Sequence, residues 1–131
     1  MDNHRQELSE YRLEEAERCL RSAKLLFKAE DYKSAVNRSY YCVHNAIRSI
    51  FALQGKDYKK HSALMSFFRN EYIKTKVFSD RISDILRDLF FFRNKSDYED
   101  FYVVGKQEIS EQIDNAEYFL EQVKSYLGSK N

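Results

Sequence analysis

Apolar residues recur every three or four positions through most of this chain. That spacing places apolar side chains on one face of a helix, and it predicts helices over about residues 5–29, 32–53, 61–71 and 106–127, with another beginning near Asp80. The longest apolar stripes are Leu13, Ala16, Leu20, Ala23 and Phe27; Val36, Tyr40, Val43, Ile47 and Ile50; Ile82, Ile85, Leu86, Leu89 and Phe90; and Ile109, Ile113, Ala116, Leu120, Val123 and Leu127. The pattern therefore predicts four long helices and one short one.

Local signals mark several helix ends. Asp31 precedes the second helix and is a suitable N-cap, because its carboxylate can accept a free backbone N–H. Gly55 and Gly128 follow two of the stripes, and glycine commonly ends helices in the left-handed conformation. Residues 72–78 form an ambiguous connection, and residues 97–105 lack a helical period, so an extended connection is expected there.

The composition supports an all-α fold. The chain has 131 residues, no proline and three glycines, and a β-rich domain of this size would need more turn residues. We expect a single domain, residues 1–131 with its core at about 5–127, folded as an up-and-down four-helix bundle with an additional short helix.

Charge and cysteine content narrow the possible functions. The formal net charge is +1, so bulk electrostatic binding of nucleic acid is not expected. The two cysteines are too few for a disulfide framework, and no run of apolar residues is long enough to cross a membrane. The charged N-terminus lacks a signal-peptide core. We expect a cytoplasmic protein without a membrane segment, metal site or cofactor.

Arg93 continues the apolar stripe of the fourth helix, and Asp97 follows one turn later. A guanidinium on an inward face must pair with an acid or face a groove that holds water or an anion. The pattern leaves two interpretations open. Either Arg93 and Asp97 lock the helix end together, or Arg93 binds an anion.

Two other polar groups are candidates for the same groove. Asn37, Arg38 and Tyr41 lie together on the second helix, and a small basic corner at the start of the third is formed by Lys59, Lys60 and His61. The alternative in each case is ordinary solvent exposure, of Asn37 and Arg38 on the helix and of the loop that carries the lysines.

Three consecutive aromatic residues, Phe90, Phe91 and Phe92, cover most of the circumference of the fourth helix. One face of a bundle cannot bury all three rings. Either a second copy of the chain covers them, which predicts a homodimer through this helix, or the segment containing Phe101 and Tyr102 does.

Three segments together resemble the HEPN family: residues 34–46 with the Tyr40–Tyr41 pair, residues 60–67 beginning Lys60–His61, and residues 93–102 with Arg93, Asp97 and Tyr98. The resemblance covers about residues 13–127. It implies a helical bundle that dimerises near its fourth helices, with both copies of the Arg motif in one groove. Many members are encoded beside a minimal nucleotidyltransferase, and some such pairs are toxin–antitoxin systems whose toxin is a metal-independent ribonuclease.

The chain departs from the ribonuclease members at one position. Those members carry a His after four to six intervening residues beyond the Arg, whereas Tyr98 stands here after four intervening residues. A phenol with a pKa near 10 is a poor general base at neutral pH. We therefore expect a nucleotide- or RNA-phosphate-binding partner of a minimal nucleotidyltransferase, with Tyr98 or Tyr102 as possible acceptors of a nucleotidyl group. The alternatives are a ribonuclease toxin using Arg93 with Tyr98, Asp97 or His61, and a scaffold without a ligand.

Overall fold

Five α-helices and one π-helical turn make up the described part of the chain. The computed structural model describes residues 3–98 and 105–129, and for Tyr98 the backbone alone. The elements in chain order are α1 (Asn3–Lys28), α2 (Tyr32–Leu53), α3 (His61–Phe68), η1 (Arg69–Ile73), α4 (Asp80–Tyr98) and α5 (Lys106–Ser129).

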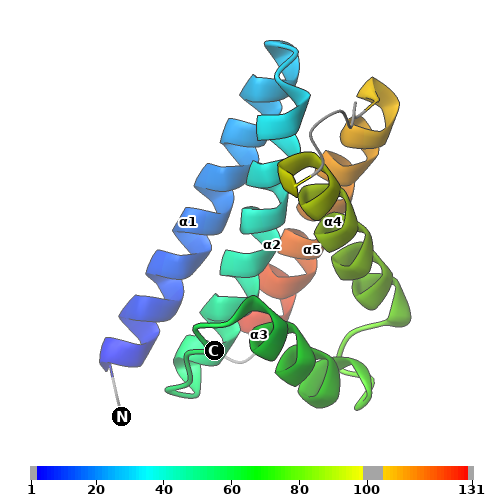
Figure 1. Cartoon of the computed structure of the whole chain (residues 1–131). Helices are drawn as coiled ribbons and strands as arrows, with labels where there is room; N and C mark the ends of the chain where they lie inside the picture. The colour runs from blue at the N-terminus through cyan, green and yellow to red at the C-terminus, as the bar shows by residue number, and fades with distance from the viewer. Residues whose placement is uncertain (1–2, 99–104, 130–131) are drawn as a thin grey trace.

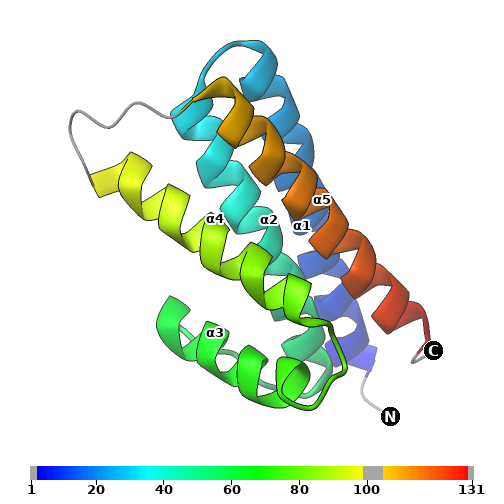
Figure 2. The same ribbon diagram turned by 90° about the vertical axis from the view of Figure 1, so that its right-hand side faces the viewer.

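The helix α2 lies at the centre of the bundle, in contact with α1, α4 and α5. The helices α1 and α2 form an antiparallel hairpin, and α3 with η1 lies at the end of the bundle where α1 begins (Figures 1 and 2). Because α2 is covered on several sides, its apolar face is wide: thirteen of its residues are buried, against five of α1. The expected all-α bundle of four long helices and one short helix is confirmed.

The two predicted boundary signals of α2 are confirmed. Asp31 Oδ1 accepts the backbone N–H of Ser34 at 3.2 Å, which satisfies one of the free donors of the first turn. Gly55 has φ +70°, and an added Cβ would stand 2.7 Å from the guanidinium of Arg5. The left-handed backbone conformation therefore favours glycine there, whereas the guanidinium of Arg5 is the far end of a flexible side chain and can move.

One core runs through all the helices. Its largest fully buried side chains include Tyr40, Phe51, Phe68, Phe119, Ile47, Leu86 and Leu89. Phe68 joins α3 to α5 and to the connection before α4, because its ring centroid lies 5.9 Å from that of Phe119 on α5 and 5.7 Å from that of Phe78. Cys19 and Cys42 are buried and free, in agreement with their apolar positions in the sequence.

Three details differ from the sequence prediction. The third helix does not end at Glu71 but continues as the π-helical turn to Ile73, because Tyr72 and Ile73 are buried in the core. Asp97 belongs to α4 rather than to an extended connection, and residues 99–104 of that connection lie outside the described residues. Gly128 does not end α5, which continues to Ser129.

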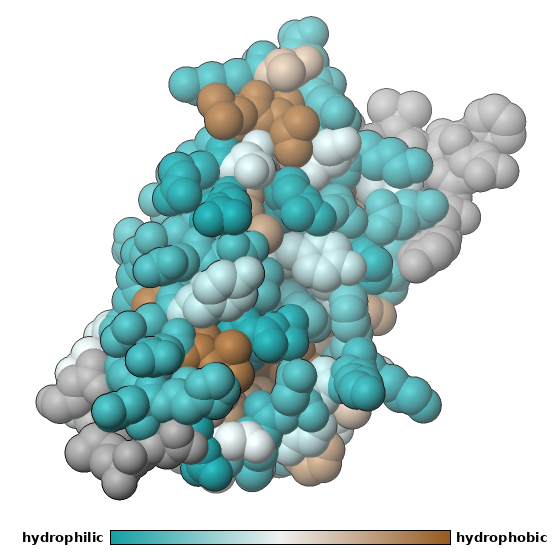
Figure 3. All heavy atoms as spheres, turned by 90° about the vertical axis from the view of Figure 1, so that its left-hand side faces the viewer, coloured by the Kyte–Doolittle hydropathy of each residue, from teal (hydrophilic) through white to brown (hydrophobic). Residues whose placement is uncertain are grey.

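The outer face along α1 is largely hydrophilic. Figure 3 shows apolar atoms there in small separate patches rather than as one continuous surface. Across residues 3–98 and 105–129, no helix combines the length and the apolar character that a membrane span needs. The polar side chains that come together to form a site lie elsewhere, between α2, α3 and α4.

Candidate functional site

Arg93 sits where the inward stripe of α4 leaves the core. Leu86 and Leu89, earlier on the stripe, are fully buried, whereas the Arg93 side chain keeps 15% of its surface exposed. Arg93 Nε lies 3.1 Å from Asp97 Oδ2, one helical turn along α4. The Arg–Asp pair, one of the two interpretations that the sequence left open, is therefore present. The exposed fraction shows that the pair does not seal the guanidinium away from solvent.

The paired tyrosines of α2 lie under the guanidinium of Arg93. Its central carbon is 5.1 Å from the Tyr40 ring centroid and 5.7 Å from that of Tyr41, within cation–π range. Arg93 Nη2 also lies 3.5 Å from the Tyr41 hydroxyl oxygen, a long contact for a hydrogen bond. Asp97 and two aromatic rings therefore fix the position of one partly exposed cation.

Asn37 connects two arginines across the site. Its Nδ2 donates to Asp97 Oδ2 at 3.4 Å, while its Oδ1 accepts from Arg38 Nη2 at 2.8 Å. The Arg38 guanidinium also lies 5.1 Å from the Tyr41 ring centroid. The result is a polar chain from Arg38 through Asn37 and Asp97 to Arg93. The sequence left open that Asn37 and Arg38 are simply exposed to solvent. In the structure both residues are partly buried within this network of polar contacts.

His61 enters the site from the first residue of α3. Its Nδ1 lies 2.8 Å from the hydroxyl oxygen of Tyr40, and which atom donates depends on the imidazole tautomer. His44 of α2 also packs against His61, with the two imidazole centroids 4.3 Å apart. We call Arg93, Asp97, Tyr40, Tyr41 and His61 the Arg93 cluster.

Burial and the neighbouring cations keep both imidazoles neutral. Desolvation lowers the pKa of His44 from 6.5 to about 4, with smaller contributions from His61 and Arg93. Desolvation also lowers the pKa of His61, and the charges of Arg93 and Arg48 act in the same direction. Burial raises the pKa of Tyr40, so its phenol stays protonated at neutral pH. The arginines thus carry the positive charge of this site.

A pocket of about 350 Å³ adjoins the Arg93 cluster. It shares Tyr41 and His61 with the cluster, and its other lining side chains are His44, Asn45, Arg48, Asp57, Tyr58 and Lys59. Arg48 is paired with Asp57 at 3.2 Å. The pocket therefore combines imidazoles, phenols and two cations with one carboxylate, which suits an anionic ligand that has hydrogen-bonding groups.

The structure brings most of the predicted site residues together. Lys60 differs from the others: it precedes α3 as an exposed residue in an extended conformation, while its neighbour Lys59 lines the pocket. The side chain of Tyr98 and all of Tyr102 lie outside the described residues. Within residues 3–98 and 105–129, no group of three or more His, Cys, Asp or Glu side chains is placed to hold a metal ion.

The aromatic triplet of α4 is divided between surface and core. Phe91 is 51% exposed and Phe90 is 37% exposed, whereas Phe92 packs partly buried against the core. The expectation that one face cannot bury all three rings is confirmed. Phe101 and Tyr102, the alternative cover, lie outside the described residues.

Sequence reasoning missed His44 and Arg48 and assigned Tyr40 to the core alone. Tyr40 is fully buried, yet its hydroxyl group reaches His61 at the site. A usable signal was present: Tyr41, His44 and Arg48 follow one another at steps of three and four, which places them on one polar stripe beside the apolar one.

Comparison with known proteins agrees with the fold and with the sequence resemblance. A protein of Thermotoga maritima named "UPF0332 protein" is 29% identical over 125 residues, covering 95% of each chain. "Putative toxin MJ0142" of Methanocaldococcus jannaschii is 29% identical over 119 residues, covering 91% of this chain and 81% of that protein.

The solved structure titled "Crystal Structure of ST0689, an archaeal HEPN homologue" superposes with a TM-score of 0.63 at 23% identity, covering 90% of this chain and 96% of that one. At this identity the likeness shows the fold alone. The family model described as "HEPN domain" matches residues 9–126, which include α2, α3 and α4, most of α1 and α5, and the whole Arg93 cluster. This chain therefore belongs to the HEPN domain family.

Proposed function

We propose that this chain binds the phosphate of a nucleotide or of RNA at the Arg93 cluster, as a dimeric, non-catalytic partner of a minimal nucleotidyltransferase in a toxin–antitoxin-type module. One observation carries the proposal: Arg93 is a partly exposed cation that Asp97 and the Tyr40 and Tyr41 rings hold in one position beside a pocket. A guanidinium fixed in advance loses little freedom when it binds a phosphate.

The surroundings of Arg93 favour a nucleotide over a bare anion. Tyr41 presents an aromatic ring on which a base can stack, and the neutral imidazoles of His44 and His61 offer hydrogen-bonding atoms in the adjoining pocket. The names of two relatives from Methanocaldococcus jannaschii, "Putative toxin MJ0142" and "Putative toxin MJ0605", support a toxin–antitoxin setting.

Fluorescence polarisation with a labelled single-stranded RNA tests this proposal. Arg93→Ala should weaken binding by about tenfold or more, because a charge-assisted contact is lost. Asp97→Asn should tighten binding, because it removes the carboxylate that competes with phosphate. Arg18→Ala, on the exposed face of α1, serves as the matched control. Equal affinities for all four proteins would refute the proposal and favour a scaffold without a ligand.

His61 supports a second candidate, a metal-independent ribonuclease. If Nδ1–H donates to Tyr40, then Nε2 carries the lone pair that a general base needs, and the lowered pKa keeps the imidazole neutral. Nε2 would take the proton of a ribose 2′-hydroxyl as that oxygen attacks phosphorus. Arg93 would stabilise the phosphorane-like charge, and the imidazolium would return the proton to the departing 5′ oxygen. In this second candidate we propose His61 as the general base, because Tyr40 holds its Nδ1 at 2.8 Å.

Expression in a bacterial host separates the two candidates. Growth arrest with loss of RNA, abolished both by Arg93→Ala and by His61→Gln, would establish the ribonuclease and overturn the non-catalytic proposal. RNA binding without cleavage, lost in Arg93→Ala and kept in His61→Gln, would establish binding alone. The exposed His4 gives the control substitution, His4→Gln.

The partner and the dimer need separate tests. Phe91, half-exposed on α4, is the position at which a second copy would bury the most apolar surface of this helix. Phe91→Glu should therefore convert a dimer to a monomer in sedimentation velocity, and a monomeric wild type would contradict the dimer.

Intact mass after incubation with the nucleotidyltransferase and ATP tests Tyr98 and Tyr102 as acceptors of a nucleotidyl group. An unchanged mass would end that idea.

A further inference from the structure

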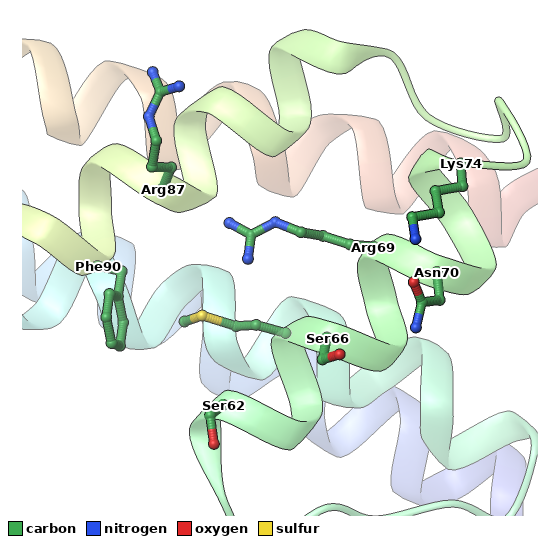
Figure 4. A pocket seen from close by; sticks show the side chains of 8 residues that line it. Ser62, Ser66, Arg69, Asn70, Lys74, Arg87 and Phe90 are labelled. Carbon is green, nitrogen blue, oxygen red and sulfur yellow. The ribbon is translucent and has the colours of Figure 1, made fainter.

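A second pocket, of about 460 Å³, lies between the α3–η1 segment and α4. It contains no residue of the Arg93 cluster. Figure 4 shows Arg69 reaching across it toward α4, with Phe90 at one end and Lys74 and Asn70 at the other. Its volume falls within the range of about 300–1,000 Å³ that small-molecule sites occupy.

The pocket carries unbalanced positive charge. Arg69 Nε donates to Ser83 Oγ at 3.3 Å, and among residues 3–98 and 105–129 its terminal nitrogens have no hydrogen-bond or ion-pair partner. Lys74 is exposed and forms no ion pair with the described part of the chain. Arg87, at the rim, is already paired with Asp84 and Asp88. Among the described residues, no acidic side chain lines the pocket, so its charge favours an anion.

The π-helical turn places the two cations together. In an α-helix, side chains five positions apart point about 140° away from each other. Here the N–H of Lys74 donates to the carbonyl oxygen of Arg69 at 2.9 Å, the i→i+5 bond of a π turn. The wider turn rotates Lys74 toward the same side as Arg69. Turns of this type are rare and often occur at functional sites.

An aromatic wall completes the pocket. Phe90 is 37% exposed, and its inner side packs on Tyr40 with ring centroids 6.3 Å apart, which fixes the ring. Met65 adds a second apolar side chain to the lining of the pocket. Any of the nucleobases can stack its planar ring on an exposed aromatic side chain. The pocket therefore offers both a phosphate contact and a base contact.

We propose that this pocket binds a nucleotide, with its phosphate on Arg69 and Lys74 and its base against Phe90. The same chemistry occurs in a free nucleotide and in one nucleotide of a single-stranded RNA. The inference does not depend on the Arg93 cluster, because none of its binding residues belongs to that cluster.

Titration of the ¹⁵N-labelled full chain with AMP, adenosine and inorganic phosphate tests the site. We expect saturable amide shifts in η1 and around Phe90 with AMP, weaker shifts with phosphate, and the weakest with adenosine. The double variant Arg69→Gln/Lys74→Gln should bind AMP at least about tenfold more weakly. Phe90→Leu should remove the advantage of AMP over phosphate.

Two controls separate this site from the Arg93 cluster and from general charge. Arg21→Gln/Lys33→Gln removes the same two charges from exposed positions on α1 and α2 and should leave AMP binding unchanged. Arg93→Ala should leave these shifts unchanged even if it abolishes binding at its own cluster. Absence of shifts in η1 at about 10 mM AMP, or wild-type affinity in the double variant, would overturn the inference.

A short single-stranded RNA distinguishes the two sources of the nucleotide. If RNA binds at least about tenfold more tightly than AMP and loses that advantage in the Arg69→Gln/Lys74→Gln variant, the pocket receives an RNA strand. If RNA binds no better than AMP, the pocket receives a free nucleotide. Both results support the inference, and they identify the ligand.

Discussion

The buried imidazole of His44 should make this protein lose stability on mild acidification. His44 is 7% exposed and packs against Tyr40, Tyr41 and His61. In the folded chain its pKa is lowered to about 4 from the ordinary 6.5 that the unfolded chain recovers. The unfolded state therefore binds a proton at a higher pH than the folded state. The stability due to neutral His44 is fully present above pH 6.5 and is lost as the pH falls toward 4.

The magnitude follows from the two pKa values. A difference of about 2.5 pKa units corresponds to about 3 kcal/mol when the full range has been titrated. Between pH 7 and pH 5 the loss is about 2 kcal/mol for His44 alone. The lowered pKa of His61 acts in the same direction, but its effect is smaller because solvent reaches that side chain.

Urea unfolding at pH 7 and pH 5 measures this loss. The wild type should lose about 2 kcal/mol or more of its free energy of unfolding, and His44→Gln should lose about 2 kcal/mol less than the wild type does. Phe67→Ala, at an exposed position, provides the control, because it removes no titratable group and should respond to pH as the wild type does. If His44→Gln and the wild type lose equal stability between the two pH values, the assignment of a neutral, buried His44 is wrong.

Two further predictions concern the scaffold. Asp31→Ala should lower the free energy of unfolding by about 1 kcal/mol, because the N–H of Ser34 loses its capping acceptor, and Asp31→Asn should restore most of it; chemical denaturation measures both. Phe68→Ala should cost about 3–5 kcal/mol, because the fully buried ring contacts Tyr72, Phe78 and Phe119. A lowered melting temperature reports it, whereas Phe67→Ala, at an exposed position, should change it far less.

Local signals predicted those parts of the fold that local interactions decide. The bounds of α2 agree with the prediction because Asp31 caps its first turn and Gly55 takes the left-handed conformation after its end. The end of α3 was predicted wrongly because it depends on the core. Tyr72 and Ile73 are buried only when α3 packs on its neighbours, and the chain extends the helix as a π turn to bury them.

The sequence by itself determined the family and the helical bundle, because the spacing of apolar residues marks the buried face of each helix. It placed Arg93 on the inward stripe of α4 but left open whether Arg93 pairs with Asp97, and the extent of α4 in the structure decided that. The tertiary structure decided the rest of the site. It alone brings Asn37 to Asp97 across 60 positions and His61 to Tyr40 across 21. Contacts between distant positions depend on how helices dock, and the spacing of apolar residues along one helix carries no information about that docking.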